Sequence, residues 1–319
     1  MDVIYIIIEN AFFSIIPLII VAFGGLYAER SGVTNIALEG QMLMGAFAGI
    51  LLVRSLQNQT SLEPQMIFII AMIVGGIVGL IFALTHAYSS IIMKSDQIIS
   101  ATALNLFAPA FAIFTARTIQ TGQQIQFTSN FLIRKIPILS EIPIIGEIFF
   151  SRVYLSLYVA ILVIFIGWFV LMKTRFGLRL RACGENPHAA DSLGVNIYRV
   201  RFIGVAISGF LAGLGGVAFI ISIGSEFNAT VSGFGFLAIA VLIFGNWNPF
   251  RIVLAASIFG LLRSLSSSYY SIPFIYNLDL PTQIYGMLPY IATLVVLIFF
   301  SKNSKAPKAL GQIYDQGKR

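Results

Sequence analysis

The sequence is poor in charged residues. They fill 10% of its 319 positions, against 58% for hydrophobic residues, and the mean hydropathy is +0.90. Soluble domains carry about 25% charged residues, so this composition excludes an ordinary soluble fold. The apolar residues also come in blocks of about 17–25, the length of a helix that crosses about 30 Å of hydrocarbon. The sequence therefore predicts an all-α polytopic membrane protein.

Cysteine and the common catalytic motifs are also scarce. Cys183 is the single cysteine, which excludes an internal disulfide and any metal site built from several cysteines. The sequence lacks a Walker A motif, an HExxH zinc motif and a GxSxG nucleophile elbow. It therefore predicts no ATP hydrolysis, no metal site and no covalent catalysis. His188 is near enough in sequence to act as a base for a thiol, but a bystander cysteine in a basic loop is the better interpretation.

The positive charge is unevenly distributed. The net charge is +7, and the basic residues concentrate in the loop 173–201 and in the tail 302–319. This pattern is typical of membrane topology rather than of a nucleic-acid surface, because cytoplasmic loops carry an excess of Lys and Arg. We therefore expect the loop and the C-terminal tail in the cytoplasm and the N-terminus outside. The long loop from Arg117 to Arg152 then lies outside, although it holds four basic residues.

Nine apolar segments are predicted along the chain. The first has no basic leader and no small-residue cleavage site, so we expect a retained span rather than a signal peptide. The second and seventh are short or Gly-rich. The segments are about 4–27, 36–54, 66–93, 97–115, 153–172, 201–223, 235–247, 252–270 and 283–301.

The order of these segments suggests an inverted repeat. Two four-segment halves, about 1–115 and 201–301, flank a connector segment and a cytoplasmic loop, 173–200, within a single transmembrane domain, 1–301. In each half a Gly-containing stretch leads into the second segment. Interrupted segments at matching places in two halves are typical of a transport site. The two stretches are Ser31-Gly32-Val33-Thr34-Asn35 and Val231-Ser232-Gly233-Phe234-Gly235.

Polar side chains stand at the start of the second segment, and Glu39 is the most unusual of them. A carboxylate in hydrocarbon costs several kcal/mol unless it is neutralised, paired or facing water. We therefore expect Glu39 to face the protein interior or a cavity. Either it caps the broken helix by accepting backbone N–H groups, or it contacts substrate. The candidate substrate-pathway residues are Asn35, Glu39, Gln41, Asn105 and Asn246.

A short helix is predicted in the basic loop, from Asn186 to Leu193. Asn186 suits the N-cap, Pro187 suits the first helical position, and Gly194 ends the helix. An amphipathic helix framed by arginines suits docking into a groove on a partner. The alternative is a helix lying on lipid headgroups. Its small apolar face is predicted to consist of Ala189, Ala190 and Leu193.

These motifs resemble a known family. The stretch 29–49, the loop 177–195 and the Gly-rich helix after it resemble the ABC permease family for branched-chain amino acids, sugars and nucleosides, and the resemblance spans nearly the whole chain. The sequences GFLAIAV at 235–241, GNWNP at 245–249 and APKALGQIY at 306–314 resemble the nucleoside (simple sugar) branch. The fold implied is that of a type II ABC importer permease that works by alternating access.

The resemblance also implies partners. They are a second related permease, a cytoplasmic ABC ATPase that uses ATP and magnesium, and an extracytoplasmic substrate-binding lipoprotein. The chain itself is then a translocation subunit in a bacterial cytoplasmic (inner) membrane, without enzymatic activity or a cofactor of its own. The residues expected to couple to the ATPase are Arg181, Gly184, Glu185, Asn186, Pro187, Ala189, Ala190, Leu193 and Gly194.

Two alternatives to a nucleoside importer stay open at this point. Within the same family, the cargo is a monosaccharide or a branched-chain amino acid. In a different class, the chain is a stand-alone secondary transporter. That function needs membrane-embedded ligands for a coupling ion, and Glu39 is the one plausible candidate in the sequence.

Overall fold

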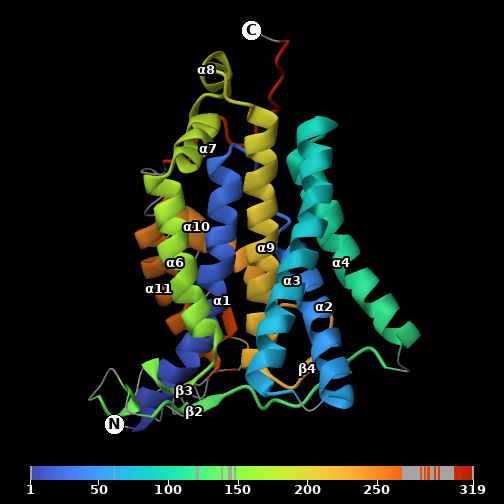
Figure 1. Cartoon of the computed structure of the whole chain (residues 1–319), viewed down its shortest axis with the longest axis vertical. Coiled ribbons are helices and arrows are strands. Elements are labelled where there is room, and N and C mark those ends of the chain that lie inside the picture. Colours follow the sequence, from blue (N-terminus) through green and yellow to red (C-terminus); the bar gives the residue numbers. More distant parts are fainter. Residues whose placement is uncertain are drawn as a thin grey trace.

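The computed structural model describes residues 2–60, 62–119, 122–137, 139–142, 146, 149–267 and 305–317, with residues 281, 284, 286, 287, 291 and 294 between the last two ranges. The described part is a bundle of long helices with two short two-stranded ribbons (Figure 1). The elements are α1 (Asp2–Arg30), α2 (Leu38–Gln59), α3 (Pro64–Ala87) with a π-helical turn (Tyr88–Ile92), α4 (Gln97–Ile119), β1 (Ile125–Gln126), β2 (Ile133–Lys135), a 3-10 turn (Leu139–Glu141), β3 (Ser151–Val153), α6 (Ser156–Lys173), α7 (Arg175–Glu185), α8 (Pro187–Ser192), α9 (Ile197–Ile223), β4 (Glu226–Phe227), α10 (Phe234–Phe244) and α11 (Pro249–Ser267).

Helices occupy the first eight predicted segments. α10 has 11 residues and is too short to cross a bilayer. The ninth segment, 283–301, falls almost entirely outside the described residues, so the count of nine and the inverted repeat stay predictions. Six described stretches are long and apolar enough to span a membrane: Ile8–Arg30, Pro64–Ile92, Gln97–Ile119, Ser156–Lys173, Ile197–Ile223 and Pro249–Ser267.

The two ends of the bundle differ in structure. The N-terminus and the strands lie at one end, here called the strand end, while α7, α8 and the tail 305–317 lie at the other, here called the α8 end (Figure 1). In the ribbons, β1 pairs antiparallel with β4 and β2 pairs antiparallel with β3. The long connection between α4 and α6 therefore shares the strand end with the N-terminus, as the predicted topology requires. The compartment that each end faces stays a prediction.

α9 is the central helix of the bundle and packs against α1, α2 and α3. Glycines make this close packing possible. A Cβ atom on Gly213 would collide with the carbonyl oxygen of Gly75, and one on Gly45 would collide with the Cα atom of Gly213. Small residues of this kind let membrane helices approach until their backbones touch. The Gly209–Gly213 pair therefore has the packing role that its GxxxG spacing predicts.

Gly213→Ala should destabilise the bundle because α3 and α9 must separate to admit the new methyl group. The expected loss is about 1–3 kcal/mol, seen as a lower thermal unfolding midpoint of the purified protein in detergent. Gly224→Ala is the control, since a Cβ atom there meets its nearest neighbour at 3.9 Å. Equal midpoints for the two variants would contradict the glycine-mediated packing.

Candidate functional site

The break between α1 and α2 is held by side chains from other helices. The backbone N–H of Thr34 donates to Gln97 Oε1 at 2.7 Å, and the Thr34 carbonyl oxygen lies 3.1 Å from His86 Nε2. Arg201 Nε donates to the carbonyl oxygen of Ser31 at 3.2 Å. Non-helical backbone at membrane depth needs such partners, because hydrocarbon supplies none. The break is thus a structured element.

Asn105 of α4 closes the start of α2. Its Oδ1 accepts the backbone N–H of Gly40 at 2.8 Å, and its Nδ2 donates to the carbonyl oxygen of Ile36 at 2.9 Å. The first N–H groups of a helix have no partner within the helix. Asn105 therefore acts as a cap that a neighbouring helix of the same chain supplies. One of the predicted pathway residues therefore has a clear structural role.

Asn35 and Gln41 form a second, fully buried pair. Asn35 Nδ2 donates to Gln41 Oε1 at 3.0 Å and to Ser208 Oγ at 2.8 Å, and Gln41 Nε2 donates back to Asn35 Oδ1 at 3.1 Å. Both side chains are inaccessible to solvent. In this conformation neither side chain presents a polar group to a translocation pathway. Their hydrogen bonds hold the break before α2 against α9.

Glu39 caps a helix, but not the one in which it stands. Its Oε1 accepts the backbone N–H of Gly233 at 2.9 Å and its Oε2 accepts that of Gly235 at 2.7 Å. Both belong to the start of α10, whose N-cap residue Gly233 has a left-handed φ of 76°. The predicted capping role is thus present in the geometry, with the correction that Glu39 of α2 caps α10.

The N-termini of α2 and α10 meet at this carboxylate. α2 runs from there to the strand end, where Gln57 bonds to both the N–H and the carbonyl oxygen of Thr128. α10 runs the opposite way, toward the turn at Trp247. Helix N-termini carry partial positive charge, so two such ends face one negative side chain. Antiparallel interrupted helices are what an inverted repeat would produce.

Asn246 lies apart from the other four predicted pathway residues. It sits in the turn after α10 at the α8 end, where its Oδ1 accepts the backbone N–H of Lys305 at 2.6 Å. Its neighbour Trp247 donates from Nε1 to Glu29 Oε2 at 2.6 Å and accepts on its carbonyl oxygen from Arg30 Nη2 at 2.8 Å. The structure therefore corrects the grouping of Asn246 with the residues around Glu39.

The helix predicted in the basic loop is confirmed as α8, Pro187–Ser192. Asn186 is its N-cap, accepting the N–H of Ala189 on Oδ1 at 3.1 Å, and Pro187 occupies the first helical position. Gly194 follows with a φ of 80° in a Schellman turn. Local capping signals were sufficient to predict this element.

The apolar face predicted for α8 is wrong in detail. Ala190 is buried against its own chain, whereas Ala189 is exposed and Leu193 has 85% of its side chain exposed. Residues four apart share a helix face, while the next residue is turned by about 100°. The face open to a partner therefore consists of Ala189 and Leu193.

The tail 305–317 ties the α8 end to the break before α2. The backbone N–H of Ala309 donates to the Gly184 carbonyl oxygen at 2.8 Å, and that of Gly311 donates to the Gly32 carbonyl oxygen at 3.2 Å. Gly184 lies in the last turn of α7, and Gly32 lies in the break. One short segment thus bonds to both. Sequence reasoning missed this role, for which composition gives no signal.

Aromatic and charged contacts add to the attachment of the tail. The Tyr314 ring lies 5.2 Å from that of His188 and 5.6 Å from that of Tyr198, between centroids. Asp315 pairs with Lys94 at 2.9 Å, which raises the pKa of the Lys94 amine through a hydrogen bond and charge attraction. The pair is exposed and contributes little to stability. The buried Tyr314 ring is the stronger anchor.

The remaining candidate coupling residues lie on α7. Gly184 touches the backbone of Arg30, and the half-exposed Glu185 has its Oε1 3.8 Å from Arg30 Nη1. Arg181 is half-buried on the preceding turn. Between them Cys183 is buried, and desolvation raises its pKa to about 11. Its thiol therefore stays protonated at neutral pH, consistent with the interpretation of a bystander cysteine.

A family model described as branched-chain amino acid transport system / permease component matches residues 7–297. No solved structure matches the chain.

Three relatives cover nearly all of the chain. The nucleoside ABC transporter permease protein NupC of Lactococcus lactis is 39% identical over 98% of this chain and 98% of its own length. The guanosine ABC transporter permease protein NupQ of Bacillus subtilis is 42% identical over 95% and 94%. The putative glucose ABC transporter permease protein TsgC13 of Haloferax volcanii is 29% identical over 94% of each chain.

Replacing Glu39 should weaken the α2–α10 junction in a graded way. Glu39→Gln keeps one acceptor but turns an amide donor toward a backbone N–H, and Glu39→Leu keeps no acceptor. Each N–H left without a partner costs about 1–3 kcal/mol, so the thermal unfolding midpoint in detergent should fall further for Leu than for Gln. The matched control is Glu63→Gln, because Glu63 precedes α3 without a side-chain capping bond. Equal losses for Gln and Leu would assign the effect to charge alone.

Proposed function

Because the chain belongs to the family of permease components of branched-chain amino acid transport systems, we propose that it is the membrane-spanning subunit of an ATP-driven importer for nucleosides. The observation that supports a nucleoside as the cargo is the similarity, over almost the full length, to two permeases named for nucleoside and guanosine transport. A separate ATPase subunit supplies the energy, and this chain provides the path.

The geometry at Glu39 supports an uncharged cargo. Helix N-termini that meet inside a transporter are favourable places for anionic groups of a substrate. Here both oxygens of the Glu39 carboxylate already accept N–H groups of α10. A free amino acid would bring its own carboxylate to a place where that role is filled. A nucleoside is neutral and needs no anion site. A monosaccharide is neutral too, and the lower identity to the glucose permease makes it the second candidate.

The same geometry argues against a stand-alone secondary transporter. Such a transporter needs ligands for a coupling ion in the membrane, and Glu39 is the candidate predicted from the sequence. The buried Glu29 near the end of α1 already accepts from Trp247 Nε1. A carboxylate that caps a helix with both oxygens has less capacity left to bind a cation. An ATP-driven import mechanism requires no such ligand.

Motion is proposed to travel from α8 to the meeting point of α2 and α10. The ATPase contacts α8 in the cytoplasm, and the α7–α8 unit is bonded through Gly184 and the tail to the break before α2. Displacing that break moves the α2 N-terminus and, through Glu39, α10. Nine apolar segments arranged as an inverted repeat would let two such permeases rock around a central path. In this scheme the strand end faces the outside, where a substrate-binding lipoprotein delivers the cargo.

Uptake by the reconstituted complex tests the cargo. Proteoliposomes that contain this chain, its partner permease, the ATPase and the binding protein should accumulate labelled guanosine or adenosine when ATP is present. Excess unlabelled nucleoside should compete, and glucose or leucine should not. Uptake driven by an ion gradient without the ATPase would refute the ATP-driven mechanism, and competition by glucose alone would reassign the cargo.

Ala189→Glu should disrupt the contact with the ATPase because the charge points outward from α8 into a partner surface. We expect at least tenfold weaker pull-down of the ATPase and loss of stimulated ATP hydrolysis, with the thermal midpoint of the permease unchanged. Ala189→Ser is the control that keeps the small size. Ala190→Glu should instead lower the thermal midpoint, because Ala190 is buried in this chain. Normal ATPase binding by Ala189→Glu would rule out α8 as the docking helix.

A further inference from the structure

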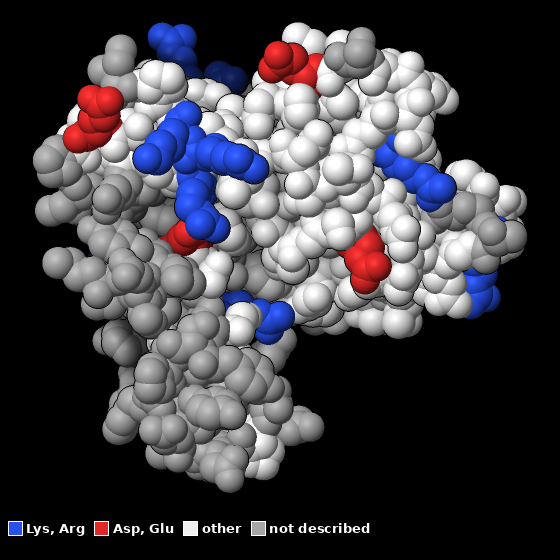
Figure 2. Space-filling view, turned by 90° about the horizontal axis from the view of Figure 1, so that it is seen from below, with Lys and Arg blue, Asp and Glu red and all other residues white. Residues whose placement is uncertain are grey.

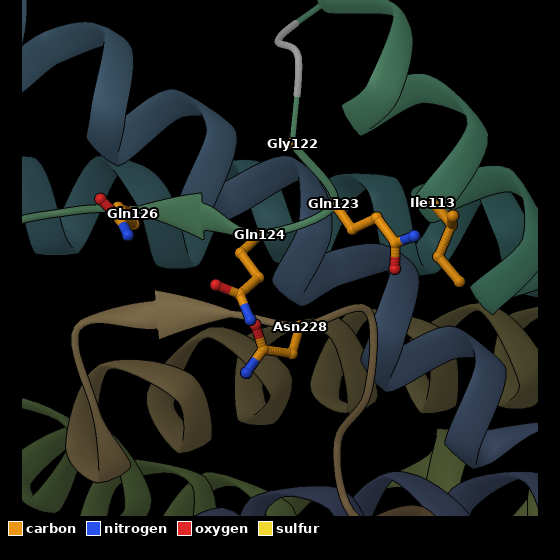
Figure 3. Close-up of a pocket in the computed structure, with 6 residues that line it drawn as sticks. All are labelled: Ile113, Gly122, Gln123, Gln124, Gln126 and Asn228. Carbon is orange, nitrogen blue, oxygen red and sulfur yellow. The ribbon is translucent and has the colours of Figure 1, made fainter.

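A polar hollow lies at the strand end, where α4 diverges from the rest of the bundle (Figures 1 and 3). Its volume is about 390 Å³. In Figure 3 the side chains of Gln124 and Asn228 point toward one another, and Gln123 extends from the same segment toward Ile113 of α4. We call this site the amide hollow; it is lined by Ile113, Gly122, Gln123, Gln124, Gln126 and Asn228.

A second hollow of about 500 Å³ shares Gly122, Gln124 and Gln126 with the first. Residues of the segment 122–126 therefore line both hollows, and Asn58 adds a further amide from α2 to the second. The segment is fixed in place because β1 pairs with β4. Carboxamides thus gather here from α2, from the segment after α4 and from the turn after β4.

The chemistry of this lining fits a neutral, planar, hydrogen-bonding ligand. A carboxamide presents a donor and an acceptor in one plane, and the same pairing occurs along the edge of a purine or pyrimidine, which Asn and Gln bind in this way. Among the described residues, the lining of the amide hollow holds no charged side chain, but Glu226 Oε1 accepts from Asn228 Nδ2 at 3.0 Å and Arg54 lines the second hollow. Seen from the strand end, the described surface is mostly uncharged, with scattered side chains of both signs (Figure 2). Because a carboxylate is bonded to Asn228, the amide hollow suits a neutral ligand better than an anionic one.

Phenylalanine rings lie between the amide hollow and the Glu39 site. Phe47 of α2 contacts Phe111 of α4 at 6.3 Å and Phe227 of β4 at 6.1 Å, between centroids. Phe107 stacks on Phe111 at 5.5 Å, and both rings are partly exposed, by 51% and 38%. Aromatic rings can stack on any base, because stacking uses the face of the base and not its hydrogen-bonding edge.

The order of these groups is the same on two helices. On α2, Phe47 stands between Glu39 and Gln57, and on α4, Phe111 stands between Asn105 and the hollow. With a rise of about 1.5 Å per residue, Phe47 is roughly 12 Å along the axis from Glu39. From the strand end inward, both helices therefore pass a polar hollow, then the rings, then the capped start of α2.

We infer that the amide hollow is where the base of an incoming nucleoside first binds this permease. Gln124 and Asn228 hydrogen-bond to the edge of the base, and Phe111 and Phe107 offer the next, stacking contact on the way inward. This inference rests on the proposed function, since a nucleoside cargo supplies the base. Recognition of the base at this point would select the cargo before the interrupted helices move.

Photo-crosslinking with 8-azidoadenosine tests the inference directly. In the reconstituted complex the crosslinked peptides should map to residues 107–128 or 226–228, and excess adenosine, but not ribose, should protect them. Asn228→Asp and Gln124→Glu keep the side-chain shape and remove the amide donor. Each should lower the crosslinking yield and raise the nucleoside concentration for half-maximal uptake by about tenfold, the effect of one hydrogen bond.

Matched variants separate this site from general damage at the strand end. Asn130→Asp makes the same chemical change at an exposed position outside both hollows and should behave as wild type. Phe111→Leu should lower uptake, whereas Phe114→Leu should not, because Phe114 is 70% exposed on α4 and makes none of these ring contacts. Crosslinks confined to other helices, or unchanged uptake in both amide variants, would overturn the inference. If the wild-type complex imports no nucleoside, the proposed function itself has failed.

Discussion

Two interrupted helices at membrane depth must find partners for their free backbone groups inside the protein, and the rest of the structure depends on how they do so. Each helix start is capped by a side chain from a different helix: Asn105 of α4 caps α2, and Glu39 of α2 caps α10. α4, α2 and α10 are therefore linked in series. A movement of one cap changes the environment of the next, which is a physical basis for concerted motion within a bundle that is otherwise closely packed.

The α8 end, which is the proposed docking site of the ATPase, extends this series. Arg201 bonds to the carbonyl oxygen of Ser31 in the break and to that of Gln312 in the tail, with distances of 3.2 and 3.0 Å. The base of α9 is thus joined to the same break that receives the Gly311 bond. Backbone carbonyls rather than long side-chain pairs make most of these links. These hydrogen bonds are the route by which the proposed displacement of the α7–α8 unit would reach the break before α2.

The helices and the capping of α8 could be predicted from the sequence, because hydropathy and the Asn186-Pro187 pair act locally. The partners of the helices could not. Glu39 and Gly233 are 194 residues apart, and an unusual carboxylate predicts the need for a partner without identifying it. Helical periodicity likewise separates Ala189 from Ala190 only when the covering segment is known. The tail lies beside α8, where the Tyr314 ring contacts that of His188, and its sequence gave a family resemblance but no contact. The substrate role of the predicted pathway residues stays a prediction.

The position of the tail has a consequence for biogenesis. Residues 305–317 leave the ribosome after every helix that they contact, yet they supply partners for Gly184, Gly32 and Arg201. Until then the break before α2 holds backbone groups with incomplete bonding in an otherwise inserted chain. Insertion and completion of the fold are therefore separate events in time. A chain that lacks the tail would insert its helices into the bilayer, but a membrane protease would still recognise it as incompletely folded.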